Sequence, residues 1–100
     1  VLQYIHQNFH TPLTLSEMTN QFHMSERSFC RLFKKELHIS FIQYLKTYRI
    51  IQSISFLQKR KDSSIEEIAN ATGYESLAAF SNAFYEYTGM RPSQMRKMIT

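Results

Sequence analysis

Cysteine, glycine and proline are scarce in this 100-residue chain, and each scarcity narrows the possible folds. The single cysteine excludes an internal disulfide framework and fits a reducing compartment. Two glycines and two prolines leave little room for tight β-turns, which favours an all-α chain. No apolar run reaches the length of a membrane span and no signal-peptide pattern is present, so we expect a cytoplasmic protein without a membrane partner.

The charge of the chain is positive and unevenly placed. The formal net charge is +4, with a pI near 9.4. The first fifty positions contain six Lys and Arg residues and three acidic residues, whereas the last fifty contain six Lys and Arg residues and five acidic residues. This balance permits an anionic partner such as nucleic acid. Because Val1 lies inside an apparent helix, we expect the chain to be a fragment of a longer protein. An effector or dimerisation domain, where the parent chain has one, is expected before Val1.

Apolar spacing and capping residues predict helices throughout the first sixty residues. Residues 1–9 have helical periodicity, and Thr14 with Glu17 forms a capping-box pattern that opens a second short helix. Ser25 is the expected N-cap of a third helix. Its expected core stripe is Phe29, Leu32, Phe33 and Leu37. Ser40 precedes a long helix over about 41–59 that is apolar on more than one side, which predicts packing on two sides.

The same pattern returns after about fifty residues. "TLSEMTNQFHMS" matches "SIEEIANATGYES", and "SERSFCRLFKKE" matches "SLAAFSNAFYEY". Ser64 with Glu67 is a second capping box, Ser76 is the next N-cap, Gly89 a C-cap and Pro92 the first turn of a last helix. A short helix, a tight turn and a longer helix describe a helix-turn-helix. The sequence predicts two such subdomains, 1–39 and 61–100, joined by a connecting helix at 40–60.

In the longer helix of the first copy, the charged residues lie on the side opposite the expected core stripe. Arg27, Arg31 and Lys34 share one side of this helix, and Arg can hold guanine O6 and N7 with two hydrogen bonds. We expect Arg27 and Arg31 to read bases. Lys34 and Lys35 are expected to contact phosphates, as is the helix start at Ser25. The alternative is an ordinary solvated face.

The same side of the second copy is almost uncharged. Asn82, at the place of Arg31, can bond adenine N6 and N7, while Leu77 and Ala78 can pack on a thymine methyl group. Tyr85 can donate to a phosphate, and Ser76 and Ser81 are further phosphate candidates. The alternative is a weakly polar surface. A connector of about twenty residues spans roughly 30 Å. Because adjacent major grooves lie about 34 Å apart, the two helices are expected to enter adjacent grooves or to bend the DNA.

A longer motif resembles a known family. "GYESLAAFSNAFYEYTGMRPSQMR" at 73–96, "MSERSFCRLFKKE" at 24–36 and Arg49 are similar to the DNA-binding domain of AraC/XylS transcription regulators. The resemblance implies about seven helices, promoter binding and usually activation through contact with RNA polymerase. It places base contacts at Arg27, Cys30, Arg31, Leu77, Ala78 and Asn82. His23 and His38 stand where this family commonly has glycine, so we expect those turns to be shaped differently.

The main alternative function is a helical interaction module that binds an acidic protein. Nothing predicts an enzyme, a cofactor or a nucleotide-binding loop. His6 and His10 have the i, i+4 spacing of a metal pair but lack a third ligand of clear type nearby, so no metal site is expected.

Overall fold

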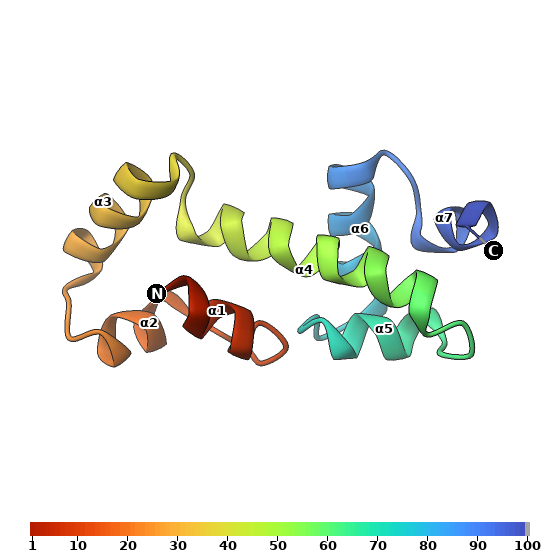
Figure 1. Ribbon diagram of the computed structural model, residues 1–100, viewed down its shortest axis with the longest axis horizontal. Coiled ribbons are helices and arrows are strands. Elements are labelled where there is room, and N and C mark those ends of the chain that lie inside the picture. The colour runs from red at the N-terminus through yellow and green to blue at the C-terminus, as the bar shows by residue number, and fades with distance from the viewer. Residues whose placement is uncertain (100) are drawn as a thin grey trace.

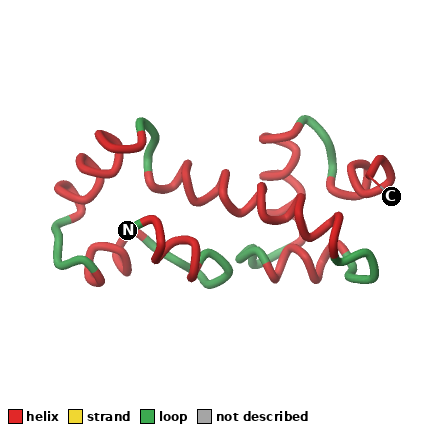
Figure 2. Tube along the Cα trace, viewed as in Figure 1, coloured by secondary structure: helices red, strands yellow, loops and turns green. Residues whose placement is uncertain are grey.

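The computed structural model describes residues 1–99, which contain seven α-helices and no strand (Figure 1, Figure 2). The helices are α1 (Leu2–Asn8), α2 (Leu15–Gln21), α3 (Glu26–Leu37), α4 (Phe41–Lys59), α5 (Ile65–Ala71), α6 (Leu77–Thr88) and α7 (Pro92–Ile99). Short loops join them (Figure 2). The expected all-helical fold is confirmed. We call α2 with α3 the first unit, and α5 with α6 the second unit; α4 connects them.

Five helices begin at the hydroxyl residues that the sequence predicts. In each case the cap oxygen accepts a hydrogen bond from the backbone N–H three residues later, at 3.0–3.2 Å. The caps are Thr14, Ser25, Ser40, Ser64 and Ser76. At Ser64 the capping box is complete, because Glu67 Oε1 also accepts from the Ser64 N–H at 2.8 Å. At Thr14 only the first half forms, so the prediction of a full capping box there was wrong.

Left-handed turn residues occur at matching places in the two units. His23 (φ 54°) and His38 (φ 66°) have the positive φ that Gly73 (φ 92°) and Gly89 (φ 78°) have in the second unit. The expectation of differently shaped turns at the two histidines was therefore wrong. The left-handed conformation costs a residue with a side chain roughly 1–2 kcal/mol, and the fold tolerates this cost at both histidines.

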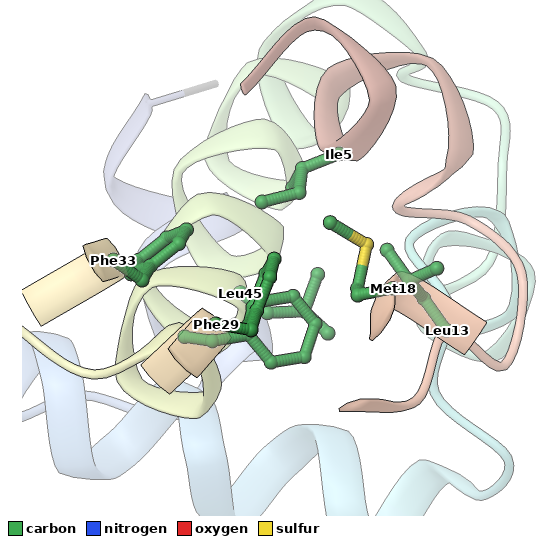
Figure 3. Packing of buried hydrophobic residues seen from close by; sticks show 7 residues of the cluster. Ile5, Leu13, Met18, Phe29, Phe33 and Leu45 are labelled. Atoms are coloured by element: carbon green, nitrogen blue, oxygen red, sulfur yellow. The ribbon is translucent and has the colours of Figure 1, made fainter. Parts of the chain in front are cut away.

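The first hydrophobic core joins α1, α2, α3 and the start of α4 (Figure 3). Its buried residues are Ile5, Leu13, Met18, Phe29, Phe33, Phe41 and Leu45. The rings of Phe29, Phe33 and Phe41 pack against one another with centroids 5.8–5.9 Å apart. Leu32 departs from the predicted stripe, since it is 45% exposed and borders an apolar groove with Val1 and Leu2.

The second core lies at the other end of α4. It consists of Ile50, Leu57, Ile68, Ala69, Phe80 and Phe84. The long helix thus contributes Phe41 and Leu45 to the first core, and Ile50 and Leu57 to the second. This confirms the predicted packing of α4 on two sides and gives an elongated molecule of 43 × 21 × 21 Å.

Two arginines hydrogen-bond to loops that come earlier in the chain than the helices carrying these arginines. Arg49 of α4 donates from Nε to the Phe9 carbonyl (2.9 Å) and from Nη2 to the Thr11 carbonyl (2.8 Å). Burial lowers the pKa of the Arg49 guanidinium from its ordinary value. Arg96 of α7 donates in the same manner to the Ser63 (2.5 Å) and Arg60 (3.0 Å) carbonyls. These bonds hold the α1–α2 loop against α4 and the α4–α5 loop against α7.

Candidate nucleic-acid interface

The core aromatics determine which faces of α3 and α6 are left for a partner. Phe29 and Phe33 are buried on the inner side of α3, and Phe80 and Phe84 on the inner side of α6. The opposite side of each helix is therefore turned to solvent. Figure 1 shows α3 beside the start of α4, and α6 crossing behind the second half of α4. We call these two solvent-facing sides the outward faces.

The outward face of α3 holds the first set of predicted residues together. Its members are Arg27, Cys30, Arg31, Lys34 and Lys35, and all five are exposed. Within residues 1–99 no ion pair or hydrogen bond engages the four cationic side chains. Cys30, Arg31, Lys34 and Lys35 also border one open surface hollow. The arrangement offers a line of hydrogen-bond donors and positive charge to an anionic ligand.

The two serines predicted as phosphate contacts are engaged within the chain as caps. Ser25 Oγ accepts from the Ser28 N–H at 3.1 Å and donates to Ser28 Oγ at 3.0 Å. Ser76 Oγ accepts from the Ala79 N–H at 3.1 Å. Both hydroxyls thus start the helices that carry the outward faces, and they remain exposed there.

The outward face of α6 gathers the second set. Leu77 and Tyr85 are 44% and 49% exposed, Ala78 and Asn82 are exposed, and Ser81 is half-buried. Leu77 thus presents an exposed apolar side chain at the start of α6, of the kind that can pack on a base methyl group.

One residue on this face was missed by the sequence reasoning. Arg91, in the connection between α6 and α7, donates from Nη1 to Asn82 Oδ1 at 3.1 Å and to Ser81 Oγ at 3.2 Å. Its Cζ lies 4.6 Å from the centroid of the Tyr85 ring, in a cation–π contact. Three of the predicted residues, Ser81, Asn82 and Tyr85, thus contact an arginine that was not predicted. The only signal in the sequence was an arginine between Gly89 and Pro92, close enough to fold back on α6.

His6 of α1 and His10, in the turn after α1, take no part in a metal cluster among the described residues. His6 Nε2 and Tyr44 Oη are 2.7 Å apart, and the His6 ring stacks on Tyr48 with centroids 4.4 Å apart. Within residues 1–99 no three His, Cys, Asp or Glu side chains are grouped as a metal site would require. None of the helices described is both long and apolar enough to span a membrane.

Comparison with known proteins decides the family. A family model described as a helix-turn-helix domain, of the AraC type, matches residues 18–98. The chain belongs to the AraC/XylS family. The C-terminal domain of AraT, a response regulator from Geobacillus stearothermophilus, is 34% identical with a TM-score of 0.92, and the match covers 96% of this chain and 79% of that one.

Two further matches connect the AraC/XylS fold to its function. The DNA-binding domain of the global transcriptional factor AdpA, solved with a target DNA, is 25% identical with a TM-score of 0.92, over 97% of this chain and 86% of that one. The regulatory protein HptR of Staphylococcus aureus is 32% identical over 97 residues, which are 97% of this chain and 38% of HptR. The findings support DNA-binding transcription regulation and do not favour the interaction module.

Proposed function

We propose that this chain binds double-stranded promoter DNA sequence-specifically, with α3 and α6 in adjacent major grooves. The observation that carries the proposal is the pair of outward faces on α3 and α6, two helices that pack against different parts of α4 (Figure 1). The 19 residues of α4 span about 28 Å. Since adjacent grooves lie about 34 Å apart, a modest bend of the DNA toward the protein would seat both helices.

The proposed DNA contacts are assigned from the position of each residue along its helix and from the chemistry of its side chain. Arg27, Cys30 and Arg31 lie in the first two turns of α3, where a recognition helix meets base edges. Leu77, Ala78 and Asn82 occupy the same turns of α6. Residues at the rims of the two faces are assigned to the backbone of the DNA, where charge and hydroxyl donors suffice. They are Ser25, Lys34, Lys35, Ser76, Ser81 and Tyr85.

The proposal extends to the role of the whole protein. The chain spans 35% and 38% of two regulators that it matches, the Msm operon regulatory protein of Streptococcus mutans and HptR. We propose that 1–39 and 61–100 are DNA-binding subdomains around the connecting segment 40–60. A parent chain with an effector or dimerisation domain before Val1 would act in a bacterial cytoplasm, as an activator that contacts RNA polymerase. The proposal includes no catalytic step and no cofactor.

A salt titration tests the DNA-binding function. We expect the purified domain to bind a duplex obtained by random-sequence selection, with an affinity that falls steeply as salt rises, because each phosphate contact releases counterions. A scrambled duplex should bind more weakly. An acidic polypeptide is the control for simple charge attraction. If no duplex binds more tightly than about 1 μM at low salt, where counterion release favours binding most, the proposal fails.

A further inference from the structure

The side chain of Arg91, in the α6–α7 connection, folds back onto α6 and places a positive charge there. Arg91 Nη1 donates to the Ser81 carbonyl at 3.3 Å, in addition to its bonds with Ser81 Oγ and Asn82 Oδ1. Together with the Tyr85 ring, these contacts hold the guanidinium over the second and third turns of α6. With the 51-residue offset of the repeat, Asn82 and Tyr85 correspond to Arg31 and Lys34. The second outward face therefore has a cation at the level where α3 has its own.

The position of Arg91 is an unfavourable one for starting a helix. Its counterpart in the repeat is Ser40, whose Oγ caps α4 by accepting from the Gln43 N–H at 3.1 Å. An arginine side chain has no acceptor, and the loss of a side-chain N-cap costs about 1 kcal/mol. The start of α7 relies instead on Gln94 Oε1, which accepts from the Arg91 N–H at 2.8 Å. The contacts of the head group on α6, rather than the start of α7, account for an arginine here.

The bond to Arg91 decides the hydrogen-bonding character of Asn82. Because a guanidinium only donates, the amide oxygen of Asn82 faces it and has one of its two lone pairs occupied, while both N–H donors of the amide NH₂ are left for a ligand. Within residues 1–99, Nε and Nη2 of Arg91 donate to no other group. The pair therefore presents mainly donors: the NH₂ of Asn82, and Nε and Nη2 of Arg91. Adenine needs one donor and one acceptor from the protein, whereas guanine offers two acceptors, O6 and N7.

We propose that Arg91 and Asn82 form a specificity-determining pair that reads a guanine in the half-site under α6. The inference rests on the proposed binding mode, and it replaces the adenine contact that Asn82 alone predicts. Tyr85 supports the pair through its cation–π contact with the guanidinium, which limits the orientations of the donor fork. Both units then contact guanine through an arginine, which is Arg31 of α3 in the first unit and Arg91 of the α6–α7 connection in the second.

The test compares wild-type protein with Arg91→Ala on duplexes from a random-sequence selection. We expect a guanine in the second half-site, and a 10- to 100-fold loss of affinity for that duplex in Arg91→Ala, as for other bidentate base contacts. Replacing this guanine by 7-deazaguanine removes only the N7 acceptor. It should weaken the wild-type complex about tenfold and leave the Arg91→Ala complex unchanged. Arg91→Lys should keep affinity for mixed-sequence DNA but lose the guanine preference, because lysine lacks the fork.

The control is Lys97→Ala, which removes an exposed cation of α7 outside the contacts of the pair. It should leave base preference unchanged, and thermal melts should show that both variants fold. Equal weakening of all duplexes by Arg91→Ala, with a smaller salt slope, would mean a phosphate contact and would overturn the inference. No effect at all would mean a purely intramolecular role and would also overturn it. A wild-type domain that binds no duplex defeats the proposed function itself.

Discussion

The backbone of Gly73 lies directly against the carbonyl oxygen of Phe9. A Cβ added to Gly73 would collide with that oxygen and would lie 2.8 Å from Arg49 Nε. The residue also has a positive φ of 92°. Phe9 follows α1, Gly73 lies in the turn of the second unit, and Arg49 donates to Phe9 from α4 between them. This contact joins the end of α1 to the turn of the second unit, beside α4.

Gly73→Ala is expected to destabilise the fold by about 3 kcal/mol, because the left-handed strain adds to the steric clash. Gly89 is the matched control, since it has a φ of 78° but nothing within 4 Å of an added Cβ. Gly89→Ala should cost only about 1–2 kcal/mol of strain. Urea unfolding measures both values. Equal losses would contradict the role of close approach at Gly73.

Phe33→Ala is expected to cost about 3–5 kcal/mol, because it opens a cavity in the first core. Leu32→Ala, one residue earlier, should cost about 1 kcal/mol or less, since Leu32 is 45% exposed. The free energies of unfolding from urea titrations compare the two. A larger loss at Leu32 would show that the apolar groove beside α1 is covered in solution.

Acid should weaken the fold partly through Glu67. Its carboxylate accepts a hydrogen bond from the Ser64 backbone and interacts with the Ser64 side chain, and these interactions hold its pKa below the ordinary value of 4.5. A depressed folded-state pKa stabilises the native state above the unfolded-state pKa, and this contribution is lost as the pH falls through the folded-state value.

The variant Glu67→Gln should therefore lose less stability than the wild type when the pH is lowered from about 6 to about 3. Thermal melts across this range measure the difference. Glu66→Gln leaves the capping box intact and should follow the wild-type curve. Identical curves for the wild type and Glu67→Gln would mean that the capping box does not contribute to acid sensitivity.

Arg31→Ala should cost about 1–3 kcal/mol at the preferred duplex and relax base choice at one position of the first half-site. Lys35→Ala should weaken all duplexes about equally and reduce the salt slope. Binding titrations against the selected duplex and its single-base variants separate the two effects. If Asn82→Ala cost more specificity than Arg31→Ala, the order of importance of the two units would be reversed.

Most of the fold was predictable because its determinants are local. A hydroxyl residue before an apolar periodicity starts a helix through bonds that reach only three residues, so Ser25, Ser40, Ser64 and Ser76 were found directly. The repeat then placed the helices in two similar units. The outward faces followed because residues of a helix that do not face the core must face solvent.

The errors came from contacts between segments far apart in the sequence. Periodicity includes Leu32 in the core stripe, but burial depends on a covering neighbour, and only the groove with Val1 and Leu2 lies there. The positive φ of His38 was missed because an average preference for glycine does not exclude another residue. Arg91 was missed because a loop residue has no periodic face, and only the folded chain shows that it returns to α6.

The double role of α4 constrains its length as well as its stability. Phe41 and Leu45 of this helix belong to one core, and Ile50 and Leu57 to the other. One residue inserted between Leu45 and Ile50 would turn the second core by about 100° around the helix axis and shift it by about 1.5 Å. Both units would still have their cores, yet α3 and α6 would no longer be in the relative orientation that the proposed binding to one face of a DNA duplex requires. In the proposed binding mode, α4 thus sets both the distance and the rotation between α3 and α6, so an operator would have to keep the rotational setting of its two half-sites as strictly as their bases.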